Sequence, residues 1–155
     1  MSVTFQTEKM SRLLHELLGR EVTIKNGPAV TAKDAVFTAS YVGDSDDLLA
    51  LCLCDLELVL DCGAALCLIP VYEVTKSLKA KQLDPALSEN FKEVLNICAQ
   101  LFGTGSAQRV RLASVYRTGD DVPEPVKKFM ADSKVRRDLQ LAISGYGSGK
   151  MTVFC

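Results

Sequence analysis

Between Asp84 and Phe102, in the stretch DPALSENFKEVLNICAQLF, apolar residues recur with the spacing of an α-helix. Apolar side chains three and four positions apart form one stripe, as on a helix that packs against a core. Asp84 can cap the first turn, and Pro85 suits the first helical position because its missing N–H is not needed there. The pattern predicts a helix whose buried face consists of Leu87, Phe91, Val94, Leu95, Cys98, Leu101 and Phe102.

The polar residues of this stretch lie on a narrow line opposite the apolar stripe. Glu89, Glu93, Asn96 and Gln100 are separated by four, three and four positions, so their side chains are neighbours on one helix face. Asn96 costs a helix interior roughly 0.5 kcal/mol relative to alanine. We expect the line to face water or a partner, and the spacing alone fits an ordinary solvated face as well as a functional surface.

Two other long stretches show helical periodicity, residues 5–18 and residues 55–69. The first ends at Gly19, a suitable C-cap, and the second begins after Asp55, a suitable N-cap. Small residues at 63–65 would let another helix approach the second helix closely, so we expect it to lie beside the helix that starts at Asp84. Shorter helices are predicted over residues 71–79 and, exposed to solvent, over residues 123–131.

Strand patterns fill most of the remaining chain. Leu48 to Cys54 is a nearly continuous apolar run, which is typical of a central strand covered on both faces. Glycines at 145, 147 and 149 mark the turn of a terminal hairpin, whose second strand, Met151 to Cys155, is apolar enough to be an unprotected sheet edge. Further strands are predicted over residues 21–25, 35–42, 108–116 and 135–143.

These elements predict an α+β fold: one mostly antiparallel sheet of about six strands with two long helices packed on one face. The length of 155 residues suits a single domain spanning residues 1–155.

Composition narrows the classes of partner. Lys and Arg number 18 and Asp and Glu number 19, so the chain has no strong field that would indicate nucleic acid or an anionic membrane as a partner. No stretch is typical of a signal peptide or a membrane span. The six cysteines form no CxxC pair and five lie in apolar runs, which indicates reduced core residues of a cytoplasmic protein.

The sequence offers little catalytic machinery of its own. It holds one histidine, His15, and no cluster with the ligand spacing of a metal site. The acidic loop at residues 43–47 lacks the ligand spacing of a calcium site, and the glycines at 145–149 join two strands instead of opening a helix. We therefore expect no metal and no cofactor bound by the chain itself.

One motif on the predicted long helix carries a family resemblance. The segment Glu93-Val94-Leu95-Asn96-Ile97, with Glu-x-x-Asn on the exposed line, resembles the signature helix of the CheC/CheX/FliY family, phosphatases of the phosphorylated chemotaxis regulator CheY. The order of elements, with a leading helix, an apolar helix over residues 55–69, the signature helix and terminal strands, suits a CheX-like chain. Like such chains, this sequence has one signature helix, where CheC-type chains have two.

The resemblance implies a mechanism in which the helix docks into a receiver domain that already holds an aspartyl phosphate and Mg²⁺. Asn96 would then orient the attacking water, and Glu93 would pair with the active-site lysine of the receiver. Glu89, Lys92 and Gln100 would contact the partner. The Mg²⁺ would belong to the receiver of the response regulator.

The family pattern is not matched everywhere. Glu89, with Ser88 beside it, stands where the family tends to have Asp or Ser, and Gln100 stands where CheX-like helices often have Gly. An alternative is therefore a non-catalytic module of the same fold that binds a response regulator, or a part of a flagellar or secretion assembly. The resemblance also gives a precedent for a homodimer formed through a sheet edge.

Overall fold

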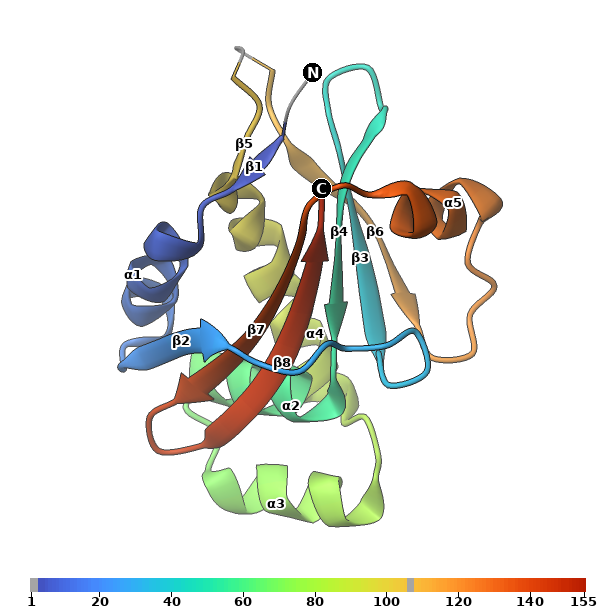
Figure 1. Ribbon diagram of the computed structural model, residues 1–155. Helices are drawn as coiled ribbons and strands as arrows, with labels where there is room; N and C mark the ends of the chain where they lie inside the picture. Colours follow the sequence, from blue (N-terminus) through green and yellow to red (C-terminus); the bar gives the residue numbers. More distant parts are fainter. Residues whose placement is uncertain (1–2, 106–107) are drawn as a thin grey trace.

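The computed structural model describes residues 3–105 and 108–155, and its centre is a six-stranded antiparallel sheet (Figure 1). The strand order is β2-β7-β8-β4-β3-β6, and a second sheet pairs β1 with β5. The strands are β1 (Thr4–Phe5), β2 (Val22–Asn26), β3 (Phe37–Val42), β4 (Leu48–Cys54), β5 (Phe102–Gly103), β6 (Arg111–Arg117), β7 (Arg136–Ile143) and β8 (Gly147–Phe154). The helices are α1 (Thr7–Leu18), α2 (Leu56–Leu66), α3 (Val71–Ala80), α4 (Pro85–Ile97), the 3-10 turn η1 (Cys98–Leu101) and α5 (Glu124–Asp132).

Strand β4 shows how the sheet is covered on both faces, as its apolar run predicts. Successive side chains of a strand point to opposite faces. Cys52 and Cys54 lie in the large core cluster that α1, α2 and α4 complete, whereas Leu51 and Leu53 lie in a second cluster with Val126 of α5. The predicted α+β fold with two long helices on one face is confirmed.

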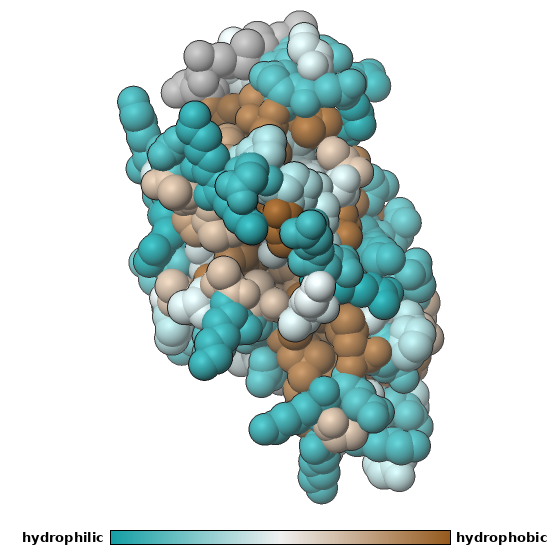
Figure 2. All heavy atoms as spheres, turned by 90° about the vertical axis from the view of Figure 1, so that its right-hand side faces the viewer, coloured by the Kyte–Doolittle hydropathy of each residue, from teal (hydrophilic) through white to brown (hydrophobic). Residues whose placement is uncertain are grey.

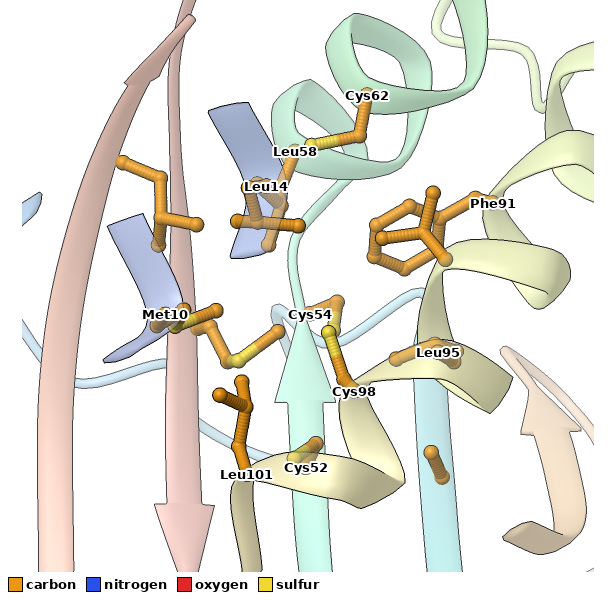
Figure 3. Close-up of a cluster of buried hydrophobic side chains, with 14 of the residues drawn as sticks. Met10, Leu14, Cys52, Cys54, Leu58, Cys62, Phe91, Leu95, Cys98 and Leu101 are labelled. Carbon is orange, nitrogen blue, oxygen red and sulfur yellow. The ribbon is translucent and has the colours of Figure 1, made fainter. Parts of the chain in front are cut away.

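Helix α4 is anchored to the sheet by its apolar stripe (Figure 3). Asp84 accepts hydrogen bonds from the backbone N–H groups of Ala86 (2.9 Å) and Leu87 (3.1 Å), so it is the predicted N-cap. Phe91 is 1% exposed and stacks on Phe37 of β3, with ring centroids 6.1 Å apart. These contacts fix both the start of the helix and its rotation about its own axis.

The close approach of α2 to α4 also follows the sequence prediction. A Cβ atom added at Gly63 would lie 2.2 Å from the carbonyl oxygen of Leu87, so only glycine fits at this crossing. The carbonyl oxygen of Gly63 accepts a hydrogen bond of 2.8 Å from the side-chain amide of Asn90. Helix α2 therefore holds α4 from the side, while the sheet holds it from below.

On the other side of the molecule one sequence prediction holds and one is wrong. Helix α5 is exposed over most of its length, as predicted, and buries Val126 against the second face of the sheet. The strand predicted to be an unprotected edge is β8, which pairs with both β7 and β4 and lies inside the sheet. Its apolar character reflects burial on both faces, and the edges of the sheet are β2 and β6.

The N-terminal segment differs in detail from its prediction. The first helix runs from Thr7 to Leu18, and Gly19 follows it in a left-handed conformation as the expected C-cap. Phe5 instead lies in β1, with its ring 5.2 Å from that of Phe102 in β5. Phe102 is buried as predicted, but in a strand and not in the helix.

The cysteines are free thiols. Four of them, Cys52, Cys54, Cys62 and Cys98, are buried in the core, as Figure 3 shows, while Cys67 is exposed and Cys155 is half-buried. Within residues 3–105 and 108–155, no helix is long and apolar enough to cross a membrane.

Replacing Phe91 with alanine should lower the free energy of unfolding by about 3–5 kcal/mol, because the change removes a buried ring and leaves a cavity beside Phe37. Urea denaturation followed by circular dichroism measures this loss. Phe91→Leu is the matched control and should cost less, since it keeps more of the buried volume. A loss below ~1 kcal/mol for the alanine variant would contradict the assigned orientation of α4.

Candidate functional site

The outward face of α4 carries the polar line that the sequence predicts. Glu89, Glu93, Asn96 and Gln100 are all exposed, and Lys92 beside them is half-buried. The opposite face of the helix is buried against the sheet and α2, so the rotation of α4 leaves these side chains outside the core. We call Glu89, Glu93 and Asn96 the α4 polar line.

Gln100 departs from the expected helical register. The α-helix ends at Ile97, and Gln100 lies in the 3-10 turn η1, so it does not continue the line with α-helical spacing. Near this end, the buried hydroxyl of Tyr41 donates a hydrogen bond of 2.7 Å to the carbonyl oxygen of Leu95. That bond supplies a partner for a carbonyl in the last turn of the α-helix.

Charge is distributed unevenly along the polar line. The Glu89 carboxylate accepts a hydrogen bond of 3.0 Å from the Lys92 ammonium, and the guanidinium of Arg117 lies 3.8 Å from the same oxygen. By contrast, the side chains of Glu93 and Asn96 make no hydrogen bond or ion pair with the described part of the chain. Glu93 therefore presents an uncompensated carboxylate next to a free amide.

Sequence reasoning missed Arg117, the last residue of the edge strand β6. It lies 20 positions beyond Ile97, the last residue of the signature motif, and only the pairing of β6 with β3 brings it next to α4. The one sequence signal was the concentration of arginines at positions 109, 111 and 117 without an acidic residue among them.

Figure 2 shows the face of the molecule that corresponds to the right-hand side of Figure 1. Hydrophilic side chains cover much of it, and apolar side chains show between them. A cavity of about 670 Å³ lies at α5 and the start of β4, with Leu48, Phe129 and Val135 among its lining residues. None of the residues of the α4 polar line contributes to that cavity. The α4 polar line is thus not part of this cavity.

The titratable groups in the core do not supply a nucleophile. Burial raises the pKa of Cys52, Cys54 and Cys62 well above the ordinary value and that of Cys98 to about 12, so these thiols stay protonated at neutral pH. Among the described residues, no group of three or more His, Cys, Asp or Glu side chains is arranged to hold a metal ion. The α4 polar line itself can pair charges and donate or accept hydrogen bonds.

Asp61 is the buried carboxylate with the most perturbed acidity. It lies on α2, is 2% exposed, and packs against the β7–β8 turn, where a Cβ atom added at Gly147 would lie 3.1 Å from its carboxylate oxygen. Burial, followed by the nearby charges of Asp55 and Glu57, raises the pKa of Asp61 from its ordinary value of 3.8 to about 7. Asp61 is not part of the α4 polar line.

Comparisons with known proteins show the fold clearly and the sequence relationship weakly. No family model matches the sequence, and no curated protein matches it. FliY of Thermotoga maritima has a similar structure, with a TM-score of 0.58 and 13% identity over 96% of this chain and 83% of that one. FliM in a complex with SpeE from H. pylori gives a TM-score of 0.63 and 8% identity, covering 95% of this chain and 80% of that one. Chemotaxis protein CheX from Vibrio vulnificus gives a TM-score of 0.51 and 12% identity, covering 95% of this chain and 91% of that one.

The raised pKa of Asp61 predicts a pH-dependent stability. Because the folded state holds the Asp61 proton more tightly than the unfolded state, this stabilising contribution is complete below about pH 4 and is lost as the pH rises towards 7. Asp61→Asn, which is neutral at every pH, should therefore gain roughly 1–3 kcal/mol relative to the natural protein between pH 4 and pH 8. Urea denaturation across this range measures the gain.

Asp132→Asn is the control for that experiment, because Asp132 is exposed on α5. It removes one carboxylate without touching the core, so it should change the free energy of unfolding at neutral pH by no more than about 0.5 kcal/mol. Identical pH dependence in Asp61→Asn and the natural protein would show that Asp61 is ionised at the same pH in the folded and unfolded states.

Proposed function

Because this chain has the fold that CheX, FliY and FliM share, we propose that it is a phosphatase that docks the α4 polar line into a CheY-like receiver domain and removes its aspartyl phosphate. The observation that supports this function most is the exposure of Glu93 and Asn96 side by side on a rigid helix, with no structural partner in the described chain. A helix interior gains nothing from an exposed asparagine, so stability does not account for Asn96.

The mechanism assigns a separate task to each side chain. Glu93 forms an ion pair with the active-site lysine of the receiver and so sets the position of α4. The Asn96 amide oxygen accepts a hydrogen bond from a water molecule and aligns that water with the phosphorus atom. The water attacks phosphorus, the bond to the aspartyl oxygen breaks, and inorganic phosphate and a free carboxylate result.

The chain contributes position and charge, and it forms no covalent intermediate. Mg²⁺ held by the receiver, and not by this chain, would supply positive charge for the phosphoryl oxygens. Alignment of a single water can accelerate a reaction by several orders of magnitude, because it removes the entropic cost of bringing the reactants together. The buried anchoring of α4 through Phe91 supports this role, since the amide must be held in place during the reaction. Such a partner would place the chain in the cytoplasm.

A second candidate function is a non-catalytic interaction module of the same fold. The likeness to FliM, which was solved in a complex with SpeE, favours this reading, as do Glu89 and Gln100 where the resembling family tends to have other residues. In this case α4 would bind a receiver or an assembly component without hydrolysis.

Replacing Asn96 with alanine separates the two functions. Alanine is the better helix former, so Asn96→Ala should leave the free energy of unfolding unchanged or raise it by roughly 0.5 kcal/mol. For a phosphatase, the same change should lower the rate of receiver dephosphorylation by ~10²-fold or more, because the attacking water is no longer aligned. Loss of acyl phosphate from a panel of phosphorylated receiver domains measures the rate.

Asn26→Ala is the matched control, since Asn26 is an exposed asparagine on β2, the far edge of the sheet. It should retain full activity. Full activity in Asn96→Ala would remove Asn96 from the mechanism, and a loss of stability above ~1 kcal/mol would show that the side chain is structural. If the unsubstituted protein binds receiver domains but hydrolyses none of their aspartyl phosphates, the result favours the interaction module.

A further inference from the structure

Arg117 has an unusual position for an exposed cation. Its guanidinium carbon lies 5.8 Å from the centroid of the Phe37 ring, and one of its terminal nitrogens lies 3.8 Å from the Glu89 carboxylate. The side chain is still 43% exposed. One face of the guanidinium is therefore held by the protein while the rest remains open to a partner.

The core fixes Arg117 relative to the α4 polar line. The Phe37 ring beneath the guanidinium is fully buried and is the same ring that stacks on Phe91 of α4. A cation above an aromatic face is attracted by the ring quadrupole, which restricts where the guanidinium can move. The aromatic pair that anchors α4 thus also locates the cation at the neighbouring sheet edge.

Two cations share the carboxylate of Glu89. The Lys92 ammonium and the Arg117 guanidinium both approach it. The nearby Asp120 carboxylate accepts a hydrogen bond of 2.7 Å from the backbone N–H of Arg117 and forms no ion pair with its guanidinium in the described chain. Glu93 lies one helical turn further on, about 6 Å away between Cβ atoms, and no cation of the described chain pairs with it. The surface therefore presents two cations that share one carboxylate and, one turn of helix away, a carboxylate without a cation.

Stability does not explain this arrangement. Ion pairs between exposed side chains contribute little because water and salt screen them. Such charges act mainly on the rate and the orientation with which a partner docks. Arg117 is also a better contact for a carboxylate than a lysine would be, since its planar guanidinium offers several donors in a fixed geometry.

We propose that Arg117 is a docking residue, supported by Lys92, that binds a carboxylate on the receiver domain while Glu93 binds the receiver lysine. The occupant of the surface is thus a receiver with an acidic side chain about one helical turn from its active-site lysine. This inference rests on the proposed function for the identity of the partner. Arg117 selects among receivers and sets the orientation of docking, and Asn96 acts on the water.

The test measures binding and turnover separately with beryllofluoride-activated and phosphorylated receiver domains. Arg117→Glu should raise the Kd and the KM by ~10-fold or more, leave kcat within about twofold, and flatten the salt dependence of binding. Arg117→Gln should give a smaller rise in the same direction and serves if the glutamate variant does not fold. Arg12→Glu changes the net charge equally at an exposed site on α1 and should leave the Kd unchanged within about twofold.

Failures of the two proposals give different results. If the natural protein hydrolyses a receiver phosphate and both Arg117 variants keep the natural Kd, or if Arg12→Glu weakens binding equally, the docking role is overturned and the phosphatase function stands. If receivers bind but are not hydrolysed, the phosphatase function fails, and a weaker Kd in the Arg117 variants still supports docking. If the natural protein binds no receiver, both proposals are overturned. A receiver variant in which the contacting carboxylate is replaced by lysine should regain affinity for Arg117→Glu.

Discussion

The burial of one face of α4 is the constraint on which the other features depend. Phe91 stacks on Phe37 of the sheet, and the absence of a side chain at Gly63 lets α2 approach the first turns of α4. Together these contacts prevent rotation of the helix about its axis. Glu93 and Asn96 are therefore held outward in a fixed orientation, which is what a side chain that aligns another molecule requires.

The aromatic pair of Phe37 and Phe91 also contacts the edge of the sheet. The Phe37 ring stacks on Phe91 and also lies 5.8 Å from the guanidinium carbon of Arg117, so a single buried ring contacts both the helix and the end of the edge strand β6. The exposed charges add little to the stability of the fold, whereas burial of the aromatic rings stabilises it. Changes to the surface charges should consequently alter function with little effect on stability, and changes to the rings should affect both.

Sequence patterns were sufficient for features that local spacing determines. The caps at Asp84 and Asp55, the run in β4 and the outward face of α4 all follow from periodicity and capping. The order of strands in the sheet does not follow from these patterns. The pattern of apolar residues shows whether the faces of a strand are buried, but not which strands pair with it. The apolar pattern of β8 therefore fits an edge strand as well as an inner one, and the prediction of an edge is wrong because β8 pairs with β4 and β7. Arg117 joins the surface through tertiary pairing alone.

The central claim is that a receiver domain docks on the α4 polar line. An NMR titration tests this claim most directly. The isotope-labelled chain is titrated with a beryllofluoride-activated receiver, and chemical shifts are followed for backbone amides and for the Asn96 side-chain amide. The account predicts that the largest changes fall on Glu93, Asn96 and the Arg117 end of β6. Changes confined to α5 and the opposite face of the sheet, with the Asn96 amide unmoved at saturation, would contradict it.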